Sequence, residues 1–166
     1  MRHSLLTSYR SFAWMCALLL LGACSSVDCP MANKIETNYQ LAGDITTLPD
    51  TLCISTTRHD GNDTVLLNNV VGASAFSLPM SYVADTDTLY FHIKSESRSS
   101  IDTIAVSKLN HTAFEALDCT PIFAHTLTGV SHTHHTIDSI VINNPNVIYG
   151  STSQNHILIY LKSNNY

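Results

Sequence analysis

The stretch TLYFHIK, residues 88–94, places an apolar side chain at every second position. Leu89, Phe91 and Ile93 share one face of an extended strand, because successive side chains of a strand point to opposite sides. The other face carries Thr88, Tyr90, His92 and Lys94. One apolar and one polar face are typical of a strand in an antiparallel sheet that buries one side only.

The same alternation recurs along the rest of the chain, in short runs separated by turn residues. The apolar members of these runs are Phe76, Leu78 and Met80, then Ile140 and Ile142, then Ile157, Ile159 and Leu161. We count about eight such strands, a number that allows two packed sheets to enclose a core. The sequence therefore predicts an all-β fold, an antiparallel β-sandwich of about eight strands.

Two polar segments predict hairpins between neighbouring strands. Asp60-Gly61-Asn62-Asp63 would join the strands 52–57 and 64–68, since Asp, Gly and Asn favour tight turns. Asn143-Asn144-Pro145-Asn146 would join 137–142 to 147–149 in the same way. A recurring phrase of Asp, then Thr or Ser, then an aliphatic residue is expected to begin strands. Its five copies start at Asp50, Asp63, Asp87, Asp102 and Asp138.

The N-terminus has the three parts of a lipoprotein signal peptide. Arg2, His3 and Arg10 form a basic leader, and residues 12–21 form an apolar run too short to span a membrane as a helix. Leu21-Gly22-Ala23-Cys24 then resembles the lipobox of bacterial lipoproteins at all four positions. We therefore expect a signal peptide over 1–23, a lipidated tether over 24–34 that begins at Cys24, and a single sandwich domain over 35–166.

Charge and composition exclude some classes of partner. The formal net charge is −5, and the eight Lys and Arg residues are scattered rather than clustered. Without a basic stripe to follow a phosphate backbone, nucleic acid is not an expected partner. Charged residues make up only 13% of the chain, which suits an exported β-protein whose outward faces carry hydroxyls and amides.

Three cysteines remain once Cys24 is assigned to lipid. Cys29, Cys53 and Cys119 allow one disulfide in an oxidising compartment and leave one thiol over. Cys29 lies on the tether and Cys119 in a loop-like segment, which favours a Cys29–Cys119 pair. Cys53 alternates with Leu52 and Ile54 and fits a small side chain within a strand. The residues alone leave the choice of pair open.

The densest group of metal-binding side chains is His132-Thr133-His134-His135. On a strand, His132 and His134 would point the same way, and a third imidazole from His125 or His156 would complete a zinc or copper site. A polar strand end is the simpler interpretation. The chain has no Gly-rich phosphate loop, no Gly-x-Ser-x-Gly and no His-Glu-x-x-His. We therefore expect neither an enzyme nor a cofactor.

Several short motifs together resemble a family of small Bacteroidota lipoproteins known only as a domain of unknown function. They are the lipobox, Asp28-Cys29-Pro30, the segments 64–67, 77–79 and 87–89, Asp118-Cys119, and the closing TIDSIVINNPNV of residues 136–147. The resemblance implies an exported all-β protein, strengthens Cys29–Cys119 as the pair, supplies no activity, and implies an outer-membrane or other envelope protein as a partner.

These observations predict a lipoprotein of the bacterial cell envelope that acts as a non-enzymatic protein-interaction or structural module. The membrane is reached through lipid on Cys24. Ser25-Ser26-Val27-Asp28 lacks the acidic run that resembles a surface-export signal, so we expect the periplasmic face of the outer membrane. The alternative is a metal- or small-ligand-binding lipoprotein that uses His132, His134 and His135.

Overall fold

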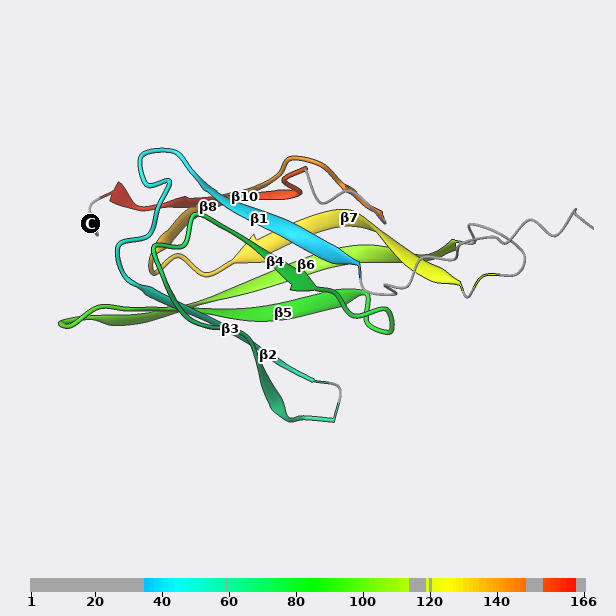
Figure 1. Ribbon diagram of the computed structural model, residues 1–166, viewed down its shortest axis with the longest axis horizontal. Helices are drawn as coiled ribbons and strands as arrows, with labels where there is room; N and C mark the ends of the chain where they lie inside the picture. The colour runs from blue at the N-terminus through cyan, green and yellow to red at the C-terminus, as the bar shows by residue number, and fades with distance from the viewer. Residues whose placement is uncertain (1–34, 59, 114–118, 120, 149–153, 164–166) are drawn as a thin grey trace, which may run out of the picture.

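The computed structural model describes residues 35–58, 60–113, 119, 121–148 and 154–163. They form ten strands in two packed sheets (Figure 1), which confirms the predicted all-β sandwich with two strands more than expected. The strands are β1 (Glu36–Ala42), β2 (Thr51–Thr57), β3 (Asp63–Val71), β4 (Ala75–Pro79), β5 (Thr86–Lys94), β6 (Ser99–Ala113), β7 (Ile122–His132), β8 (Ile137–Ile142), β9 (Asn146–Val147) and β10 (Ile157–Leu161). The predicted signal peptide and tether lie outside the described residues.

The two sheets differ in size and in strand direction. The four-stranded sheet has the order β4-β1-β10-β8, and the six-stranded sheet has the order β3-β2-β5-β6-β7-β9. β1 pairs with β10 in parallel, with Tyr39 opposite Ile157. Among the described strands this is the one parallel pair, and it departs from the predicted antiparallel arrangement. The first and last strands of the sandwich therefore lie side by side in the four-stranded sheet.

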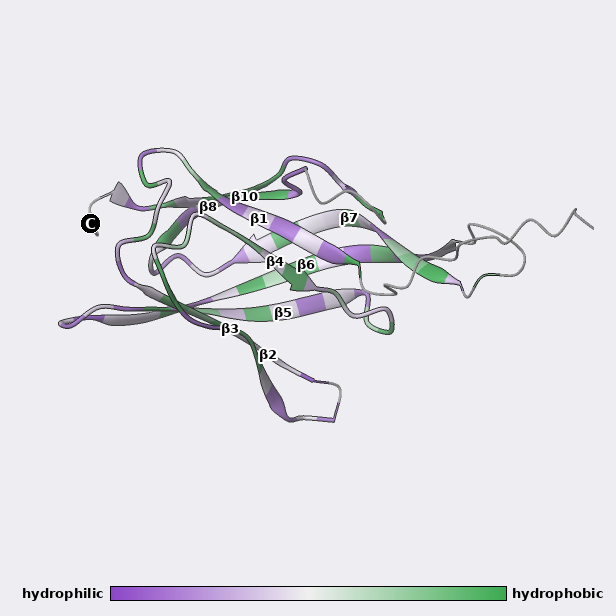
Figure 2. Cartoon of the chain, viewed as in Figure 1, coloured by the Kyte–Doolittle hydropathy of each residue, from purple (hydrophilic) through white to green (hydrophobic). Residues whose placement is uncertain are grey.

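The core lies between the sheets and is built from the alternating apolar positions. Leu89, Phe91 and Ile93 of β5 are buried, as are Ile157 and Ile159 of β10. Figure 2 shows hydrophobic and hydrophilic residues alternating along the strands. Aromatic rings join the two layers: Tyr39 stacks on Phe76 at 5.2 Å between ring centroids, and Phe76 lies 6.3 Å from Phe91. Burial, more than turn chemistry, thus decides which face of each strand points inward.

The outward face of the six-stranded sheet is mostly polar, as the composition predicted, although Ile101 and Val65 are exposed on it. Register pairs Thr51 with Lys94, Cys53 with His92, and Ser55 with Tyr90 across β2 and β5. The same face continues over β6 with Thr103 opposite Tyr90. Short hydroxyl side chains lie along this surface, so the sheet faces water without exposing its core.

One predicted hairpin is confirmed and the other is wrong. β2 and β3 pair antiparallel around the Asp60–Asp63 turn, where Gly61 has a φ of +80°. The segment 143–146 instead crosses between the sheets, because β8 pairs with β10 and β9 pairs with β7. The backbone N–H groups of Asn143 and Asn144 donate to the carbonyl of His156, and Leu127 donates to the carbonyl of Pro145. These bonds hold the crossing segment between the two layers.

The recurring Asp phrases mark strand starts at four of their five positions. Asp50 precedes β2, Asp63 opens β3, and Asp87 and Asp138 are the second residues of β5 and β8. Asp102 is the exception, because it is the fourth residue of β6 and its exposed fraction is 0%. Its carboxylate accepts hydrogen bonds from the turn before β8, a distant contact that the local phrase does not reveal.

Within the described part of the chain, no helix is long and apolar enough to cross a bilayer.

Candidate functional site

The histidine cluster lies at the turn that carries the chain from the six-stranded to the four-stranded sheet. His132 is the last residue of β7, and His134 and His135 belong to the turn before β8. The rings of His132 and His134 meet edge to face, with 4.3 Å between their centroids. Nδ1 of His132 donates to the carbonyl oxygen of Thr133 at 2.8 Å. That bond leaves Nε2 of His132 as the nitrogen available to a ligand.

Asp102, on the neighbouring strand β6, fixes the shape of this turn. One carboxylate oxygen accepts from the Thr133 hydroxyl at 2.8 Å and from the His135 backbone N–H at 2.7 Å. The other accepts from the backbone N–H groups of Thr136 (2.7 Å) and Ile137 (3.1 Å). Burial alone would raise the pKa of Asp102, but these four hydrogen bonds outweigh it and lower the pKa below its ordinary value.

The structure does not bring a third imidazole to His132 and His134. His125 lies seven residues earlier on β7, about 23 Å away along an extended strand. His156 is buried beside β1, where its Nδ1 accepts from the backbone N–H of Asn38 at 2.9 Å. In the described ranges, no group of three or more His, Cys, Asp or Glu side chains is placed to hold a metal ion. Among the described residues, a metal ion would therefore find two adjacent imidazole rings, His132 and His134, at an exposed turn.

The predicted cysteine sites are only partly within the described residues. Cys24 and Cys29 lie outside them. Cys119 is buried, and Cys53 is half-buried on the outward face of β2 with a free thiol. Cys53 is therefore the thiol left over in the predicted scheme, and the Cys29–Cys119 pair stays a prediction.

A buried lysine forms a second polar cluster that the sequence did not single out. Nζ of Lys108 lies 2.8 Å from a carboxylate oxygen of Asp87 and donates to the carbonyl of Ala84 at 2.8 Å. The side chain of Lys108 is 0% exposed. The same Asp87 oxygen accepts from the backbone N–H of Ser81 at 3.2 Å. The ion pair thus joins β5 and β6 to the loop between β4 and β5.

His125 and Asn110 extend this cluster across the sheet. Nδ1 of His125 donates to Oδ1 of Asn110 at 2.8 Å, and Nδ2 of Asn110 donates to the Ala84 carbonyl at 3.1 Å. Burial, and then the charge of Lys108, lowers the pKa of His125. Burial, and then the charge of Asp87, raises the pKa of the Tyr39 hydroxyl. The cluster is internally satisfied, which suits a role in holding the fold.

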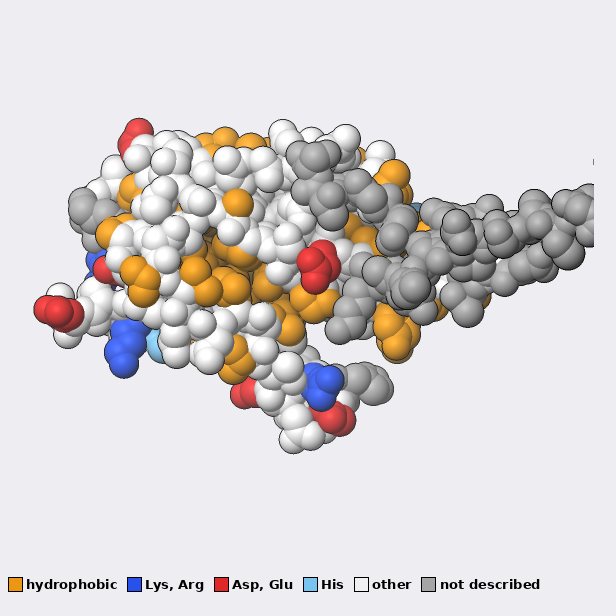
Figure 3. Space-filling model, in the orientation of Figure 1, with side chains coloured by type: hydrophobic (Ala, Val, Ile, Leu, Met, Phe, Trp, Pro, Cys, Tyr) orange, Lys and Arg blue, Asp and Glu red, His pale blue; other side chains and the backbone are white. Residues whose placement is uncertain are grey.

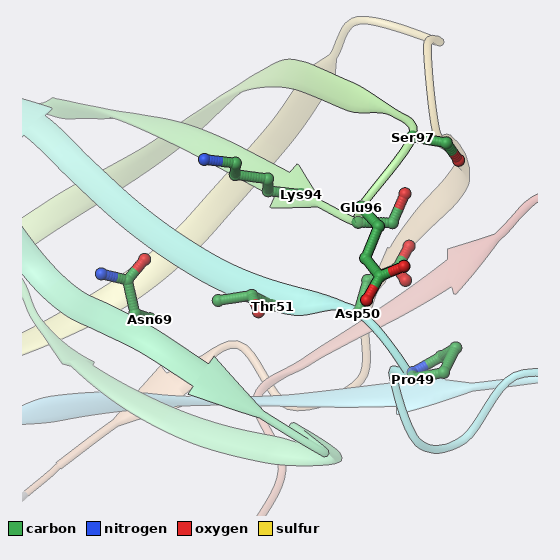
Figure 4. Close-up of a pocket in the computed structure, with 8 residues that line it drawn as sticks. Pro49, Asp50, Thr51, Asn69, Lys94, Glu96 and Ser97 are labelled. Carbon is green, nitrogen blue, oxygen red and sulfur yellow. The ribbon is translucent and has the colours of Figure 1, made fainter.

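A shallow depression lies at the far end of the six-stranded sheet, with a volume of about 790 Å³. Figure 4 shows Asp50 and Glu96 at one side of it, and Lys94 and Asn69 at the other. Asp50 also faces Arg98, at 3.8 Å between their charged atoms. Its charges are mixed and it opens widely to solvent, so it selects no particular class of ligand.

A serine and a histidine meet on the outward face of the sheet. Nε2 of His92 lies 2.7 Å from Oγ of Ser99, and the pair is exposed. Among the hydrogen bonds of the described residues, no carboxylate holds the other ring nitrogen of His92. A nucleophile needs a base that a third group orients, so this contact has the geometry of an ordinary surface hydrogen bond.

Comparison with known proteins adds one finding. A family model described as "Family of unknown function (DUF6452)" matches residues 51–161. No curated protein and no solved structure is significantly similar to the chain. The matched range runs from the first residue of β2 to the last residue of β10, so it covers most of both sheets.

Proposed function

Since the chain belongs to the Family of unknown function (DUF6452), we propose its role from its own residues: a lipoprotein of the bacterial cell envelope, anchored at Cys24, that serves as a non-enzymatic protein-interaction or structural module. The observation that carries the proposal is Leu21-Gly22-Ala23-Cys24, placed after a basic leader and an apolar run. A diacyl group on the sulfur and an acyl chain on the amino group would attach the protein stably to a membrane.

The charged clusters of the sandwich support a binding or structural role. Among the described residues, Asp102 and Lys108 are the buried charged groups, and both bond to backbone groups of turns and loops. Their partners are structural, so neither group is held ready for a reacting substrate. We propose the periplasmic face of the outer membrane as the location, because residues 25–28 lack an acidic run after the lipidated cysteine.

Lipidation predicts a simple labelling result. Cells that express the chain with labelled palmitate should yield a labelled protein in the membrane fraction, and the Cys24→Ala variant should lose essentially all of the label. Cys29→Ala is the matched control, because it removes a cysteine five residues further along the tether and should keep the label. Equal labelling of the Cys24→Ala variant would contradict the proposal.

The proposed partner is another protein of the envelope. Chemical crosslinking in intact cells, followed by purification of this chain, should then yield one defined adduct in addition to the monomer. Recovery of monomer alone, at crosslinker levels that trap a known envelope complex, would count against an interaction module.

The same proposal includes a disulfide between Cys29 and Cys119. It would tie the tether to the connection between β6 and β7 and would stabilise the domain by restricting the unfolded chain. Support comes from the burial of Cys119 and from the free thiol of Cys53, which leaves Cys29 as the remaining candidate of the three.

The alternative function is metal or small-ligand binding at the turn that precedes β8. The contact between the His132 and His134 rings favours it, because two imidazoles already lie within reach of one ion. Titration of the purified protein with Zn²⁺ in a calorimeter should then show a site that His132→Ala and His134→Ala each abolish. His111→Ala, an exposed histidine on β6, is the control. Heat that is unchanged in all three variants would reject this alternative.

A further inference from the structure

The loop between β4 and β5 exposes two large hydrophobic side chains at its tip. Tyr82 is 60% exposed and Val83 is 72% exposed. Single exposed apolar residues are common, but adjacent ones that join other exposed apolar side chains form a patch, and such patches mark contact surfaces. Figure 3 shows hydrophobic side chains at the right-hand edge of the coloured surface, on the side at which β5 begins in Figure 1.

Further apolar side chains lie around this loop. The ring of Tyr82 stacks on that of Phe123, with 4.8 Å between centroids. Phe123 pairs with Thr112 near the end of β6, and Leu109, three residues earlier on that strand, is exposed at the same end on the opposite face of the sheet. Ile148 follows β9 and is exposed. It lies at the same end of the sheet, since the preceding residue, Val147, pairs with His125. We call Tyr82, Val83, Leu109, Phe123 and Ile148 the apolar end.

The loop that carries Tyr82 and Val83 is held firmly in place. The Ala84 carbonyl accepts from the Lys108 ammonium and from the Asn110 amide, and the Asp85 carbonyl accepts from the backbone N–H of Lys108 at 2.8 Å. On the other side, the Ser81 hydroxyl accepts from the backbone N–H groups of Val83 and Ala84. Because hydrogen bonds hold the loop on both sides, the side chains of Tyr82 and Val83 stay exposed at its tip.

The chain enters the sandwich at this same end. Glu36, the first residue of β1, pairs with Pro79, the last residue of β4, and the exposed loop begins directly after Pro79. The segment 24–34 that precedes the described domain is eleven residues long and reaches at most about 40 Å when fully extended. A lipid on Cys24 would therefore attach the bilayer to the domain from the side of the apolar end, where the tether joins β1.

We propose that the apolar end is a membrane-contacting surface, and that its occupant is the interfacial region of a phospholipid bilayer. The inference rests on the proposed lipid anchor at Cys24. Tyrosine suits this region, because its ring is apolar and its hydroxyl reaches the headgroups. Glu36 and Asp85 at the same end carry negative charge, so apolar insertion beside the anchor, and not attraction to anionic lipid, would hold the domain against the membrane.

A single tryptophan can report this contact. The one tryptophan of the chain is Trp14, which lies in the proposed signal peptide, so the processed protein would contain none. Val83→Trp places one at the apolar end. Val71→Trp is the matched control, because Val71 is equally exposed, at 70%, but lies elsewhere. Val71 is the last residue of β3, and Thr51 of β2 pairs with it on one side and with Lys94 of β5 on the other. Since Lys94 is the last residue of β5, the two positions lie near opposite ends of that strand, about 30 Å apart.

The experiment uses each lipoprotein variant, purified from membranes and reconstituted in phosphatidylcholine vesicles whose acyl chains are brominated near the headgroup. Val83→Trp should lose roughly half or more of its fluorescence relative to unbrominated vesicles, since an interfacial ring lies within reach of the bromines. Val71→Trp should keep nearly all of its fluorescence. The intact mass of each sample reports separately whether lipid is attached.

The outcomes are distinguishable. Lipid on the protein with no quenching at position 83, or with equal quenching at both positions, overturns the membrane-contacting surface and leaves the anchor standing. A protein without lipid overturns the anchor itself. Protection of the tryptophan at position 83 from quenching by a bound protein in the same sample would assign the apolar end to a protein partner and reject the bilayer.

Discussion

Replacement of Asp102 by alanine is expected to lower the free energy of unfolding by about 4 kcal/mol. The substitution leaves three backbone N–H groups and the Thr133 hydroxyl without the acceptor they use in the folded protein. Thr136 and Ile137 are buried, so water cannot simply replace the lost carboxylate. Urea unfolding of the purified protein in detergent, followed by circular dichroism, measures the change.

Two further variants separate this effect from a general loss of charge. Asp102→Asn keeps the shape and one acceptor oxygen, but it turns an amide toward the N–H groups of Thr136 and Ile137, so it should lose roughly half of the same stability or more. Asp138→Ala removes an exposed carboxylate from β8 and should change stability by less than about 0.5 kcal/mol. A similarly small effect of Asp102→Ala would show that the turn does not depend on this carboxylate.

The pH dependence of the Asp102 contribution follows from the direction of its pKa shift. The folded pKa lies below the unfolded value, so the stabilisation is fully present above about pH 4 and is lost as the pH falls through the folded pKa. The stability difference between the wild-type protein and Asp102→Ala should therefore be constant from neutral pH to about pH 5 and should shrink in stronger acid.

Removal of one partner of the Asp87–Lys108 pair is the second large effect that we expect. Asp87→Asn should destabilise the protein by about 3 kcal/mol, because the Lys108 ammonium stays buried without a counter-charge. Lys108→Met should cost less than this, since Asp87 keeps some solvent exposure and its bond from Ser81. The double variant should cost clearly less than the sum of the two single changes, and a double-mutant cycle should give a coupling above about 1.5 kcal/mol.

The exposed pair Arg98–Asp50 serves as the control for this cycle. Its charged atoms lie 3.8 Å apart and the Arg98 side chain is 37% exposed, so its coupling should stay below about 0.5 kcal/mol. Equal coupling in the two pairs would show that burial of Lys108 adds nothing to its interaction with Asp87. Because the Asp87–Lys108 pair also fixes the Ala84–Asp85 part of the loop, its loss should loosen the apolar end as well.

The sequence was most informative where burial alone decides the structure. Alternation in residues 88–94 identified the buried face of β5 correctly, because a strand that buries one side must repeat every two residues. The Asp60–Asp63 hairpin was equally readable, since its turn chemistry is local. These features are enough to predict a sandwich, and they do not depend on which strands become neighbours.

Features that depend on distant residues were not readable. The parallel pairing of β1 with β10 joins segments more than 110 residues apart, and no local pattern specifies it. Asp102 belongs to a phrase that usually begins a strand, yet its partners lie about 30 residues later at the turn before β8. The predicted hairpin at 143–146 failed for the same reason, because the bonds to His156 and Leu127 that direct it come from other strands.

For the candidate site, the sequence could predict which residue types are present but not how they are arranged in space. The sequence identified His132, His134 and His135 as a dense group, and the rings of His132 and His134 do meet. The third imidazole that a metal site needs would have to come from a distant strand, and no local pattern shows that none of the described residues supplies it. Lys108 gave no signal by its type, because a lysine within a strand is usually exposed and its counter-charge is 21 residues away. A signal was present in its position, a polar residue at an inward place of β6 where the alternation calls for an apolar one.

The proposed anchor is tested most directly by the intact mass of the chain purified from membranes. We expect a protein that begins at Cys24 and carries the added mass of a diacylglyceryl group and one further acyl chain. A chain that retains residues 1–23, or one that begins elsewhere and carries no lipid, would contradict the lipid anchor at Cys24 and the membrane-contacting surface that rests on it.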